Sequence, residues 1–490
     1  MILKQVYRPQ KYKNKRPLKE QLMQKTYLYQ INPVNMKVHF IAIGGSAMHN
    51  LAIALRKKGY TITGSDDEIF NPSRTRLHKY GLLPEKMGWD ASNIHDGLDA
   101  VILGMHAKGD NPELQKAREM GLKIYSYPEF LFEQSLDKTR IVIGGSHGKT
   151  TITSMVLHVL NYHHIATDFM VGAQLEGFEV MVSLSDEAAY MVMEGDEYPS
   201  SALDLRPKFH LYNPHIALIS GIAWDHINVF KTFSDYLEQF RRFIACIEPG
   251  GKLIYNQTDG VVKEICEGHA SEDIHLYPYD LPDFEIHDGK TLVRWMDALF
   301  SVRFFGKHNL LNMNGARVIC NQLGVDDQMF YEAIGSFGGA SKRMQLIHQQ
   351  PGIRVIRDFA HAPSKVRATV EAVREQYPGA SVVACLELHT YSSLNRSFID
   401  QYQGALDAAD QAIVFYSPHA LALKKLPDLN PDEVYQAFGK KGLSVSTNKE
   451  DLLGSIKSPQ GAEIIFLMMS SGDFGGLAMD ELMASIDLSD

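Results

Sequence analysis

Short apolar runs alternate with amphipathic stretches along most of the chain. Runs typical of buried strands lie at residues 37–43, 60–64, 100–104, 140–143, 190–194, 216–220, 354–358, 381–386, 411–415 and 463–468. Helix-compatible stretches follow several of them, for example the stretch that ends near Lys58 and the run 154–160. Strands separated by helices are typical of mostly parallel sheets with helices on both faces. The pattern therefore predicts an α/β fold.

The grouping of these runs predicts three domains. A chain of 490 residues is long enough for two to four domains with large cores. We expect a Rossmann-like N-terminal domain at 36–137, a central P-loop ATPase α/β domain at 138–338 and a C-terminal Rossmann-like α/β domain at 339–490. Residues 1–35 form a basic N-terminal extension, with eight Lys or Arg against one Glu, and no function is assigned to it.

Charge and cysteine content limit the classes of partner. The formal net charge is −9, so composition implies no basic face for bulk nucleic-acid binding. Four widely spaced cysteines without a metal-type pair are typical of reduced thiols in a cytosolic protein. No apolar run is long enough to cross a membrane, and no secretory segment follows the N-terminus. We expect a cytoplasmic protein that binds neither nucleic acid nor membranes; composition favours no oligomeric state.

The segment 144–151, with the sequence GGSHGKTT, lies between the apolar run 140–143 and a helix-compatible run. A glycine-rich turn in that position directs backbone N–H groups at phosphate oxygens, and a lysine adds a full charge. Ile143 stands where the full phosphate-loop pattern has its first glycine, and a simple turn with a surface lysine is the alternative. We expect ATP to bind here, with Lys149 as the cation and Thr150 as a Mg²⁺ ligand. The expected contacts are Gly145, Ser146, His147, Gly148, Lys149, Thr150 and Thr151.

The first block carries a second glycine turn. The run 37–43 leads into a glycine turn and a helical stretch, and the next strand ends at Ser65 and Asp66. This order is typical of a Rossmann-like unit, in which the acid accepts a hydrogen bond from a ribose or base hydroxyl. Ala42 and Ala47 depart from the strict GxGxxG pattern. The expected ligand contacts are Gly44, Gly45, Ser46, Met48, Ser65 and Asp66.

Several polar residues follow predicted strands directly, where ligands of parallel sheets bind. Glu194 ends an apolar run and suits Mg²⁺ held together with nucleotide phosphates, although a helix cap or a surface acid cluster is the alternative. Asp225 and His226 follow another strand, and a lone histidine is more often structural. Asp358 and His361 form either an active-site loop or a turn.

Two more segments carry candidate nucleotide contacts. Asn309 and Asn312, in the sequence GKHNLLN, are able to read an adenine edge or to cap a helix. Arg343 follows a glycine-containing hinge at 337–339. A guanidinium from a neighbouring domain clamps a transferring phosphoryl group when domains close, and a solvated basic pair is the alternative.

Taken in order, these motifs resemble those of the Mur ligase family, the ATP-dependent amide-forming enzymes of bacterial cell-wall synthesis. GGSHGKTT is similar to the family's G-T-[HN]-G-K-T-T, which also lacks the first glycine, and EGDE at 194–197 is similar to E-A-D-E. Asp225-His226 matches the D-H pair, and GKHNLLN matches G-x-H-N-x-x-N. Arg343 falls on the arginine before the third domain, and 358–363 resembles D-D-Y-G-H-H-P, from which Arg357 and Ala362 depart. The resemblance covers residue 36 to the C-terminus.

The resemblance implies a reaction in which the lactoyl carboxylate of UDP-N-acetylmuramate is joined to an amine through an acyl phosphate. DFAH at 358–361, PKFHLYNP at 207–214 and MSSGDFGG at 469–476 are similar to the member that adds the tripeptide L-Ala-γ-D-Glu-meso-diaminopimelate in peptidoglycan recycling. HTYS at 389–392 is similar to H-R-Y-T of the alanine-adding member. We expect the tripeptide as acceptor, with L-alanine as the alternative.

The resemblance also implies residue roles. Lys149, His226 and Arg343 act in catalysis, and Glu194 and His226 hold a second Mg²⁺. The nucleotide is contacted by Asn309, Asn312, Arg343 and Asp358. The substrate is contacted by His361 and His389. A different functional class stays open beside the ligase. An NTPase that couples hydrolysis to domain movement would tolerate Ala42, Ala47 and Ala362, which depart from the ligand-binding patterns.

Overall fold

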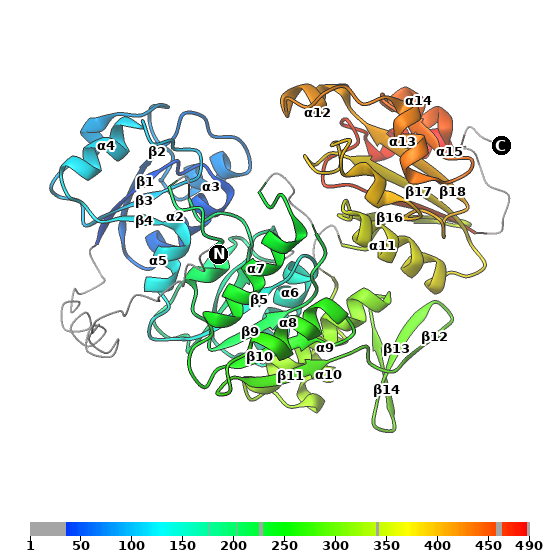
Figure 1. Cartoon of the computed structure of the whole chain (residues 1–490), viewed down its shortest axis with the longest axis horizontal. Coiled ribbons are helices and arrows are strands. Elements are labelled where there is room, and N and C mark those ends of the chain that lie inside the picture. Colours follow the sequence, from blue (N-terminus) through cyan, green and yellow to red (C-terminus); the bar gives the residue numbers. More distant parts are fainter. Residues whose placement is uncertain are drawn as a thin grey trace, which may run out of the picture.

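The computed structural model describes residues 36–175, 177–201, 203–224, 229–339, 343–456 and 463–487. Figure 1 shows three bodies that follow one another along the chain, each built around a mainly parallel sheet: blue to cyan, then cyan to green, then yellow to red. The predicted α/β class is therefore confirmed. The residue numbers at which the domains were divided remain predictions.

The N-terminal body is a four-stranded parallel sheet in the order β2-β1-β3-β4. Its strands are β1 (Lys37–Ile41), β2 (Thr61–Ser65), β3 (Ala100–Leu103) and β4 (Ile124–Ser126), and its helices are α2 (Ser46–Lys57), α3 (Ser73–Lys79), α4 (Pro112–Glu119) and α5 (Tyr127–Glu133). The register pairs Ser65 with Ile41, so the glycine turn after β1 and the acid after β2 meet at the carboxyl edge. The edge that the sequence predicted to bind a ligand is formed by this pairing.

The central body is a seven-stranded sheet in the order β11-β10-β9-β5-β8-β6-β7, parallel except where β7 pairs with β6. Its strands are β5 (Thr139–Gly144), β6 (Thr167–Met170), β7 (Val182–Ser183), β8 (Tyr190–Gly195), β9 (Ile216–Ile219), β10 (Lys252–Asn256) and β11 (His275–Tyr279). Strand β5 lies in the middle, and Gly144 pairs with both Gly195 and Ile219. The loop after β5 therefore emerges between the ends of β8 and β9.

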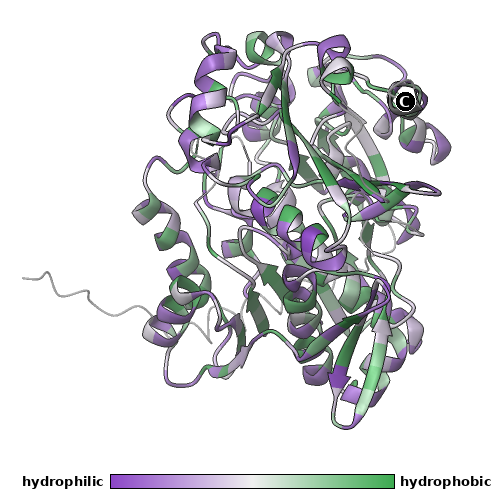
Figure 2. Cartoon of the chain, turned by 90° about the vertical axis from the view of Figure 1, so that its right-hand side faces the viewer, coloured by the Kyte–Doolittle hydropathy of each residue, from purple (hydrophilic) through white to green (hydrophobic). Residues whose placement is uncertain are grey.

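Alternate side chains of β5 pack on opposite faces of the central sheet. Ile141 and Ile143 belong to a buried cluster with helices α6 (Lys149–Tyr162), α9 (Lys307–Gln322) and α10 (Asp327–Ile334). Val142 belongs to a second cluster with α7 (Phe233–Ala245) and α8 (Gly260–His269), which continues into the N-terminal sheet. Figure 2 shows the result, with green strands inside and purple positions on the outer helices. The alternation of side chains along β5 thus places apolar residues on both faces of the central sheet.

A three-stranded antiparallel sheet projects from the central body in Figure 1 and was not foreseen from the sequence. It consists of β12 (Phe284–His287), β13 (Lys290–Trp295) and β14 (Ala298–Val302). Asp288 and Gly289 join the first two strands, and both have positive φ angles of 49° and 69°. An Asp-Gly pair between strand-like runs is a strong hairpin signal, so this element could have been found.

The C-terminal body is a six-stranded sheet in the order β15-β16-β20-β17-β18-β19, with β15 antiparallel. Its strands are β15 (Gln345–Gln350), β16 (Ile353–Asp358), β17 (Ser381–Leu388), β18 (Gln411–Tyr416), β19 (Ser444–Ser446) and β20 (Ile464–Met469). Its helices are α11 (Pro363–Gln376), α12 (Pro418–Leu423), α13 (Pro431–Phe438), α14 (Lys449–Ser455) and α15 (Met479–Asp487). Within the described ranges no helix has the length and apolar character needed to cross a membrane.

Candidate active site

The phosphate loop has the strand-turn-helix context that the sequence predicted. Strand β5 ends at Gly144 and α6 begins at Lys149. Gly145 and Gly148 have φ angles of 131° and 82°, in the left-handed region that glycine adopts without a Cβ clash. A Cβ on Gly148 would also collide with the side-chain oxygen of Asn312 on α9. The loop therefore needs glycine for its backbone and for the close approach of that helix.

Lys149 is held by a network of partly buried groups. Its Nζ donates to the Gly145 carbonyl at 2.7 Å and to Glu197 Oε2 at 2.8 Å. Glu197 Oε1 accepts from the Tyr236 hydroxyl at 3.1 Å, and that hydroxyl is 2.7 Å from Ser146 Oγ. Burial alone would lower the pKa of Lys149, but the carboxylates of Glu197 and Asp196 raise it above its usual value. The lysine is thus a permanent cation at the loop.

Glu194 lies beside Thr150, as a shared metal site requires. Its Oε2 accepts from the Gly172 N–H at 2.8 Å, while its buried Oε1 has no hydrogen-bond partner within the described part of the chain. Burial and then the charge of Asp196 raise the pKa of Glu194, and the nearby Thr150 side chain opposes this. A buried carboxylate oxygen without a partner fits a cation.

The predicted metal set is only partly visible. His226 and its neighbour Asp225 lie outside the described residues, so their placement stays a prediction. Among the described residues, no three His, Cys, Asp or Glu side chains are grouped closely enough to hold a metal ion alone.

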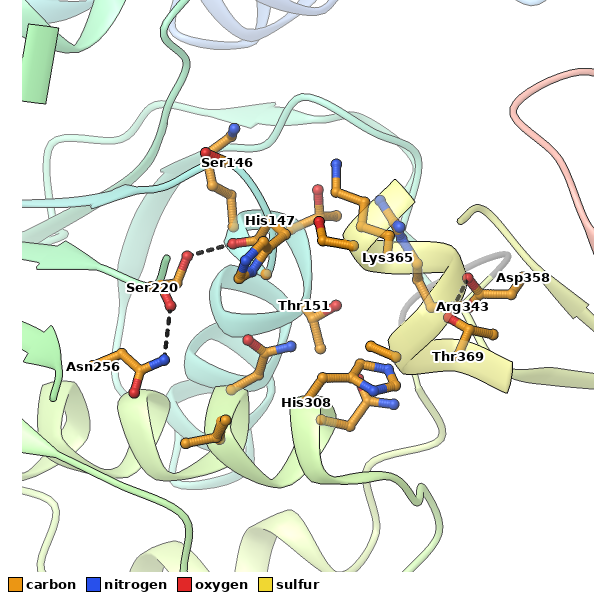
Figure 3. A pocket seen from close by; sticks show the side chains of 18 residues that line it. Ser146, His147, Thr151, Ser220, Asn256, His308, Arg343, Asp358, Lys365 and Thr369 are labelled. Carbon is orange, nitrogen blue, oxygen red and sulfur yellow. Dashed lines mark hydrogen bonds between the residues drawn. The ribbon is translucent and has the colours of Figure 1, made fainter. Parts of the chain in front are cut away.

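A cavity of about 170 Å³ lies over the phosphate loop and joins the central and C-terminal bodies (Figure 3). Predicted residues that line it are Ser146, His147, Gly148, Lys149, Thr150, Thr151, Asn309, Asn312, Arg343 and Asp358. They come from the loop, from α9, and from the segments around β15 and β16. Residues more than two hundred positions apart thus meet in the arrangement that the order of motifs implied. Lys342 lies outside the described residues.

Asp358 and Arg343 order the C-terminal side of the cavity. Asp358 Oδ2 accepts from the Met344 N–H at 2.8 Å, and its Oδ1 accepts from the Ala360 N–H at 2.7 Å. The Arg343 guanidinium lies 4.9 Å from the centre of the Phe359 ring. Asp358 therefore fixes the backbone just before β15 and just after β16 in addition to lining the cavity.

The amide side chains of α9 differ in what they contact. Asn309 Nδ2 donates to the Phe305 carbonyl at 2.9 Å, while the Asn312 side-chain oxygen approaches Gly148. His308, between Lys307 and Asn309, also lines the cavity. Burial lowers the pKa of His308, and the charge of Arg343 adds to this against the opposing charge of Asp358. Neutral imidazole and amide groups thus line the side of the cavity formed by α9.

Several cavity residues were not predicted as contacts. They are Ser220, Asn256, His308, Leu311, Ser364, Lys365, Ala368 and Thr369. Ser220 follows β9 and Asn256 ends β10, so the strand-end rule could have found both. Asn256 Nδ2 donates to the Ser220 carbonyl at 3.1 Å, and Ser220 Oγ donates to the His147 carbonyl. Lys365 had no local signal, because its helix belongs to another domain.

The N-terminal ligand edge forms as predicted around Asp66. The Gly44 N–H donates to Asp66 Oδ2 at 2.7 Å, and burial raises the pKa of Asp66 to about 6. Ala42, which stands in place of a glycine, has a φ angle of 69°. A second cavity, of about 240 Å³, begins beside this edge and lies between the N-terminal and central bodies; its lining includes Ser46, Asn50, Tyr127, Gly172, Asp196 and Lys208.

His361 and His389 lie outside the lining of the cavity over the phosphate loop. His361 Nδ1 is 2.9 Å from the Phe359 carbonyl, and the Tyr402 hydroxyl donates to the His361 carbonyl. His389 Nδ1 is 3.5 Å from Glu387 Oε1. The predicted contacts of both histidines with a substrate stay predictions.

Models of one family match three successive parts of the chain. The Mur ligase family catalytic domain matches residues 37–139, the Mur ligase middle domain matches 143–320, and the Mur ligase glutamate ligase domain matches 342–472. A UDP-N-acetylmuramate–L-alanine ligase of Agathobacter rectalis is 30% identical over 391 residues, which cover 77% of this chain and 82% of that protein. The chain belongs to the Mur ligase family. This Mur ligase is therefore an ATP-dependent enzyme that forms an amide bond, and the resemblance found in the sequence is confirmed.

A second relative has a different acceptor in its name. The UDP-N-acetylmuramate–L-alanyl-γ-D-glutamyl-meso-2,6-diaminoheptandioate ligase of Haemophilus influenzae is 28% identical and covers 90% of this chain and 97% of that protein. Both named activities belong to peptidoglycan metabolism, and the chain is placed there with them. The alternative of an NTPase without ligase activity is thereby set aside.

Solved structures share the fold of this Mur ligase. A murein peptide ligase from Psychrobacter arcticus has a TM-score of 0.62 at 23% identity and covers 92% of this chain and 98% of that one. A UDP-N-acetylmuramate–alanine ligase from Thermotoga maritima has a TM-score of 0.64 at 20% identity and covers 93% and 98%. At these identities the likeness shows the fold alone, and it confirms the predicted three-domain α/β architecture.

Proposed function

We propose that this Mur ligase joins the lactoyl carboxylate of UDP-N-acetylmuramate to the amine of the tripeptide L-Ala-γ-D-Glu-meso-diaminopimelate, with ATP as the energy source. The observation that carries the ligase chemistry is the meeting of Lys149, Asn312, Arg343 and Asp358 around one cavity. A carboxylate and an amine do not condense in water, because the amine is protonated and hydroxide leaves poorly. Phosphorylation of the carboxylate supplies a better leaving group.

The phosphate loop supports the first half of this reaction. Lys149 and the N-terminus of α6 place positive charge where the β- and γ-phosphates of ATP would lie. The carboxylate oxygen attacks the γ-phosphorus, and ADP leaves with the electrons of the broken bond. Charge that builds on the transferring group is stabilised by fixed cations, which is the main source of catalysis in phosphoryl transfer.

The residues near Glu194 fit Mg²⁺. Thr150 and Glu194 would hold the ion together with nucleotide phosphates, because the hydroxyl lies beside the carboxylate and Glu194 Oε1 has no partner within the described residues. A bound Mg²⁺ supplies positive charge that offsets the phosphate oxygens. His226 is the further ligand that the family pattern supplies.

The space beyond the phosphate loop supports a long acceptor. A cavity of about 120 Å³ adjoins the nucleotide-sized one and shares Ser146, His147, Ser364 and Lys365 with it. A further cavity of about 320 Å³ shares Trp224, Phe398 and Gln401 with that one and adds Lys231 and Tyr391. Sites of several hundred cubic ångströms accommodate ligands much larger than one amino acid. A tripeptide with several carboxylates suits this series of cavities, whose lining includes Lys365 and Lys231.

The free amino acid L-alanine is the second candidate acceptor. It is favoured by the alanine-adding relative in Agathobacter rectalis and by the segment HTYS at 389–392. In the structure His389 is oriented by Glu387, whose pKa burial would raise but hydrogen bonds from His389 and Ser470 lower. An ionised carboxylate there holds the imidazole in place.

An acceptor assay tests the proposal. The protein is incubated with ATP, Mg²⁺, UDP-N-acetylmuramate and one acceptor at a time, and ADP release and product mass are followed. We expect a kcat/KM at least about tenfold higher for the tripeptide than for L-alanine, a difference of about 1.4 kcal/mol. A tripeptide with an acetylated amino group serves as the control and should give no amide product. A preference for L-alanine would instead assign the biosynthetic reaction.

A further inference from the structure

Lys365 borders both the cavity over the phosphate loop and the cavity next to it. It is in the first turn of α11, in the C-terminal domain. Its side chain lines the cavity over the phosphate loop, and with Ser146 and His147 it also lines the adjoining cavity of about 120 Å³. Figure 3 shows Lys365 extending from the yellow helix toward the loop that carries Ser146 and His147. The residue thus borders both spaces.

The cavity has an excess of positive charge in a protein whose net charge is −9. Its described lining contains three basic side chains, Lys149, Arg343 and Lys365, and one carboxylate, Asp358, while Glu197 behind the loop pairs with Lys149. The oxygens of Asp358 accept backbone N–H groups, so that carboxylate is engaged in the loop. A surplus of cations in a partly enclosed space favours a polyanionic ligand such as a triphosphate.

The two cations of the C-terminal domain act on different parts of the cavity. Burial lowers the pKa of His147 to about 4, and the charge of Lys365 is the next largest cause. For His308, Arg343 is the cation that contributes to a lowered pKa. The charge of Lys365 therefore acts on His147 of the phosphate loop, and the charge of Arg343 acts on His308 of α9.

We propose that Lys365 binds the γ-phosphoryl group of ATP from the C-terminal domain and stays on it while the group moves to the substrate carboxylate. A carboxylate oxygen bonds to the γ-phosphorus as the bond to the β,γ-bridging oxygen breaks, and ADP keeps that electron pair. Lys365 and Lys149 then hold the transferring group from two sides. An ammonium is a compact charge that follows a moving group without fixed geometry, which suits this role better than a planar guanidinium.

The position between the cavities extends the role to the second half-reaction. The acyl phosphate formed at the loop must be attacked by an amine that enters from the adjoining space. Lys365 lines both spaces, so its ammonium remains beside the phosphate that leaves when the amide forms. Lys365 becomes part of the site only when α11 lies over the phosphate loop. This makes phosphoryl transfer depend on the C-terminal domain.

Nucleotide binding tests the proposal without any acceptor or UDP-sugar. Affinities for ADP and for a non-hydrolysable triphosphate analogue are measured by calorimetry with Mg²⁺ for the wild type, Lys365→Met and Lys365→Arg. We expect Lys365→Met to lower the affinity for the triphosphate analogue by about tenfold or more. The affinity for ADP should fall by less than about threefold, because only the analogue has a γ-phosphoryl group. Lys365→Arg keeps the charge and should keep most of the preference for triphosphate.

Arg367→Gln is the matched control. It removes one positive charge from the same helix, but Arg367 Nη2 donates to the Gln403 carbonyl at 2.8 Å and does not line the cavity. Both nucleotides should bind to this variant as they bind to the wild type. Thermal melting checks the fold, and Lys365→Gln is the second neutral variant in case Lys365→Met does not fold.

Single-turnover kinetics supplies the second readout. With all substrates present, Lys365→Met should slow ADP formation by about a hundredfold while the acceptor KM changes little. An equal loss of affinity for ADP and for the triphosphate analogue, or no loss of affinity for either, would overturn the proposal. A raised acceptor KM with intact triphosphate binding would also overturn it and would assign Lys365 to the acceptor. The binding result stands whichever amine the enzyme uses.

Discussion

Lys149 combines two roles at the scale of a single residue. Its ammonium is the cation of the phosphate loop, and it is also the partner of Glu197, which is 1% exposed. Removing one member of a buried ion pair leaves the other charge without compensation, which typically costs several kcal/mol. Activity and stability therefore both depend on this side chain, and they can be separated by a second substitution.

We expect Lys149→Met to lower kcat by about a thousandfold or more, because the γ-phosphoryl charge loses its nearest cation. The same variant should lose about 3–5 kcal/mol of unfolding free energy. Adding Glu197→Gln should recover most of that stability and none of the activity. Chemical unfolding and ADP release are the measurements. A double variant that regains activity would show that Lys149 is not the catalytic cation.

Asp66 makes the N-terminal domain sensitive to pH. Its pKa is raised from 3.8 to about 6, first by burial. The folded protein therefore binds this proton more tightly than the unfolded chain, so the contribution to stability is fully present below pH 4. It is lost as pH rises through 6. The ionised form that accepts from the Gly44 N–H is reached only above that pH.

Asp66→Asn should isolate this effect. Between pH 4.5 and 7.5 the wild type is expected to lose stability relative to the variant by on the order of 1–2 kcal/mol, because asparagine has no charge to desolvate. The affinity of the wild type for UDP-N-acetylmuramate should rise over the same range, and that of the variant should stay flat. Unfolding curves and binding titrations at matched pH values provide the check. Parallel curves for the two proteins would contradict the raised pKa.

At the scale of elements, the site depends on how closely α9 approaches the turn before α6. Gly148 has a positive φ angle, and a Cβ there would collide with Asn312 on α9. Gly268, within α8, has nothing within 4 Å of the corresponding position and an ordinary helical backbone. The two glycines thus differ in backbone conformation and in the room available for a Cβ atom.

We expect Gly148→Ala to destabilise the protein by about 1–3 kcal/mol and to weaken nucleotide binding, because backbone strain and the contact with α9 add together. Gly268→Ala should be neutral or stabilise by up to about 1 kcal/mol through helix propensity. Thermal unfolding with and without ADP measures both. A tolerated Gly148→Ala would mean that the turn and α9 are not packed as they are here.

At the scale of the whole molecule, the cavities lie between domains. The space over the phosphate loop is shared by the central and C-terminal bodies, and the second cavity by the N-terminal and central bodies. Ligands that contact two domains favour arrangements in which those domains are close. ATP should therefore draw the central and C-terminal domains together, and the UDP-sugar should draw the N-terminal and central domains together.

We expect the radius of gyration to fall when a non-hydrolysable triphosphate and UDP-N-acetylmuramate are added together, and to fall less with either alone. Small-angle X-ray scattering measures this directly. Lys149→Met is the control, because it should blunt the response to the triphosphate and leave the response to the UDP-sugar. An unchanged radius with both ligands would indicate that the domains are already closed.

Much of the fold and part of the site followed from local patterns. The main strands, the phosphate loop and the polar residues at strand ends were predicted because apolar periodicity and glycine torsions are properties of neighbouring residues. The order of the motifs then predicted which of them meet, and the cavity brings together Lys149, Asn312, Arg343 and Asp358. The projecting sheet of β12 to β14 carried a local signal in Asp288-Gly289 that the alternation of strands and helices obscured.

The sequence by itself determined the chemistry available at the loop, since the glycine torsions and the Lys149 charge are set within eight residues. Only the tertiary structure decided which distant groups surround it. The pairing of Lys149 with Glu197, the placement of Ser220 and Asn256 and the reach of Lys365 depend on the register of β5 between β8 and β9 and on a helix from another domain. Such contacts carry no periodic signature, because their geometry arises only when separate sheets and helices pack together.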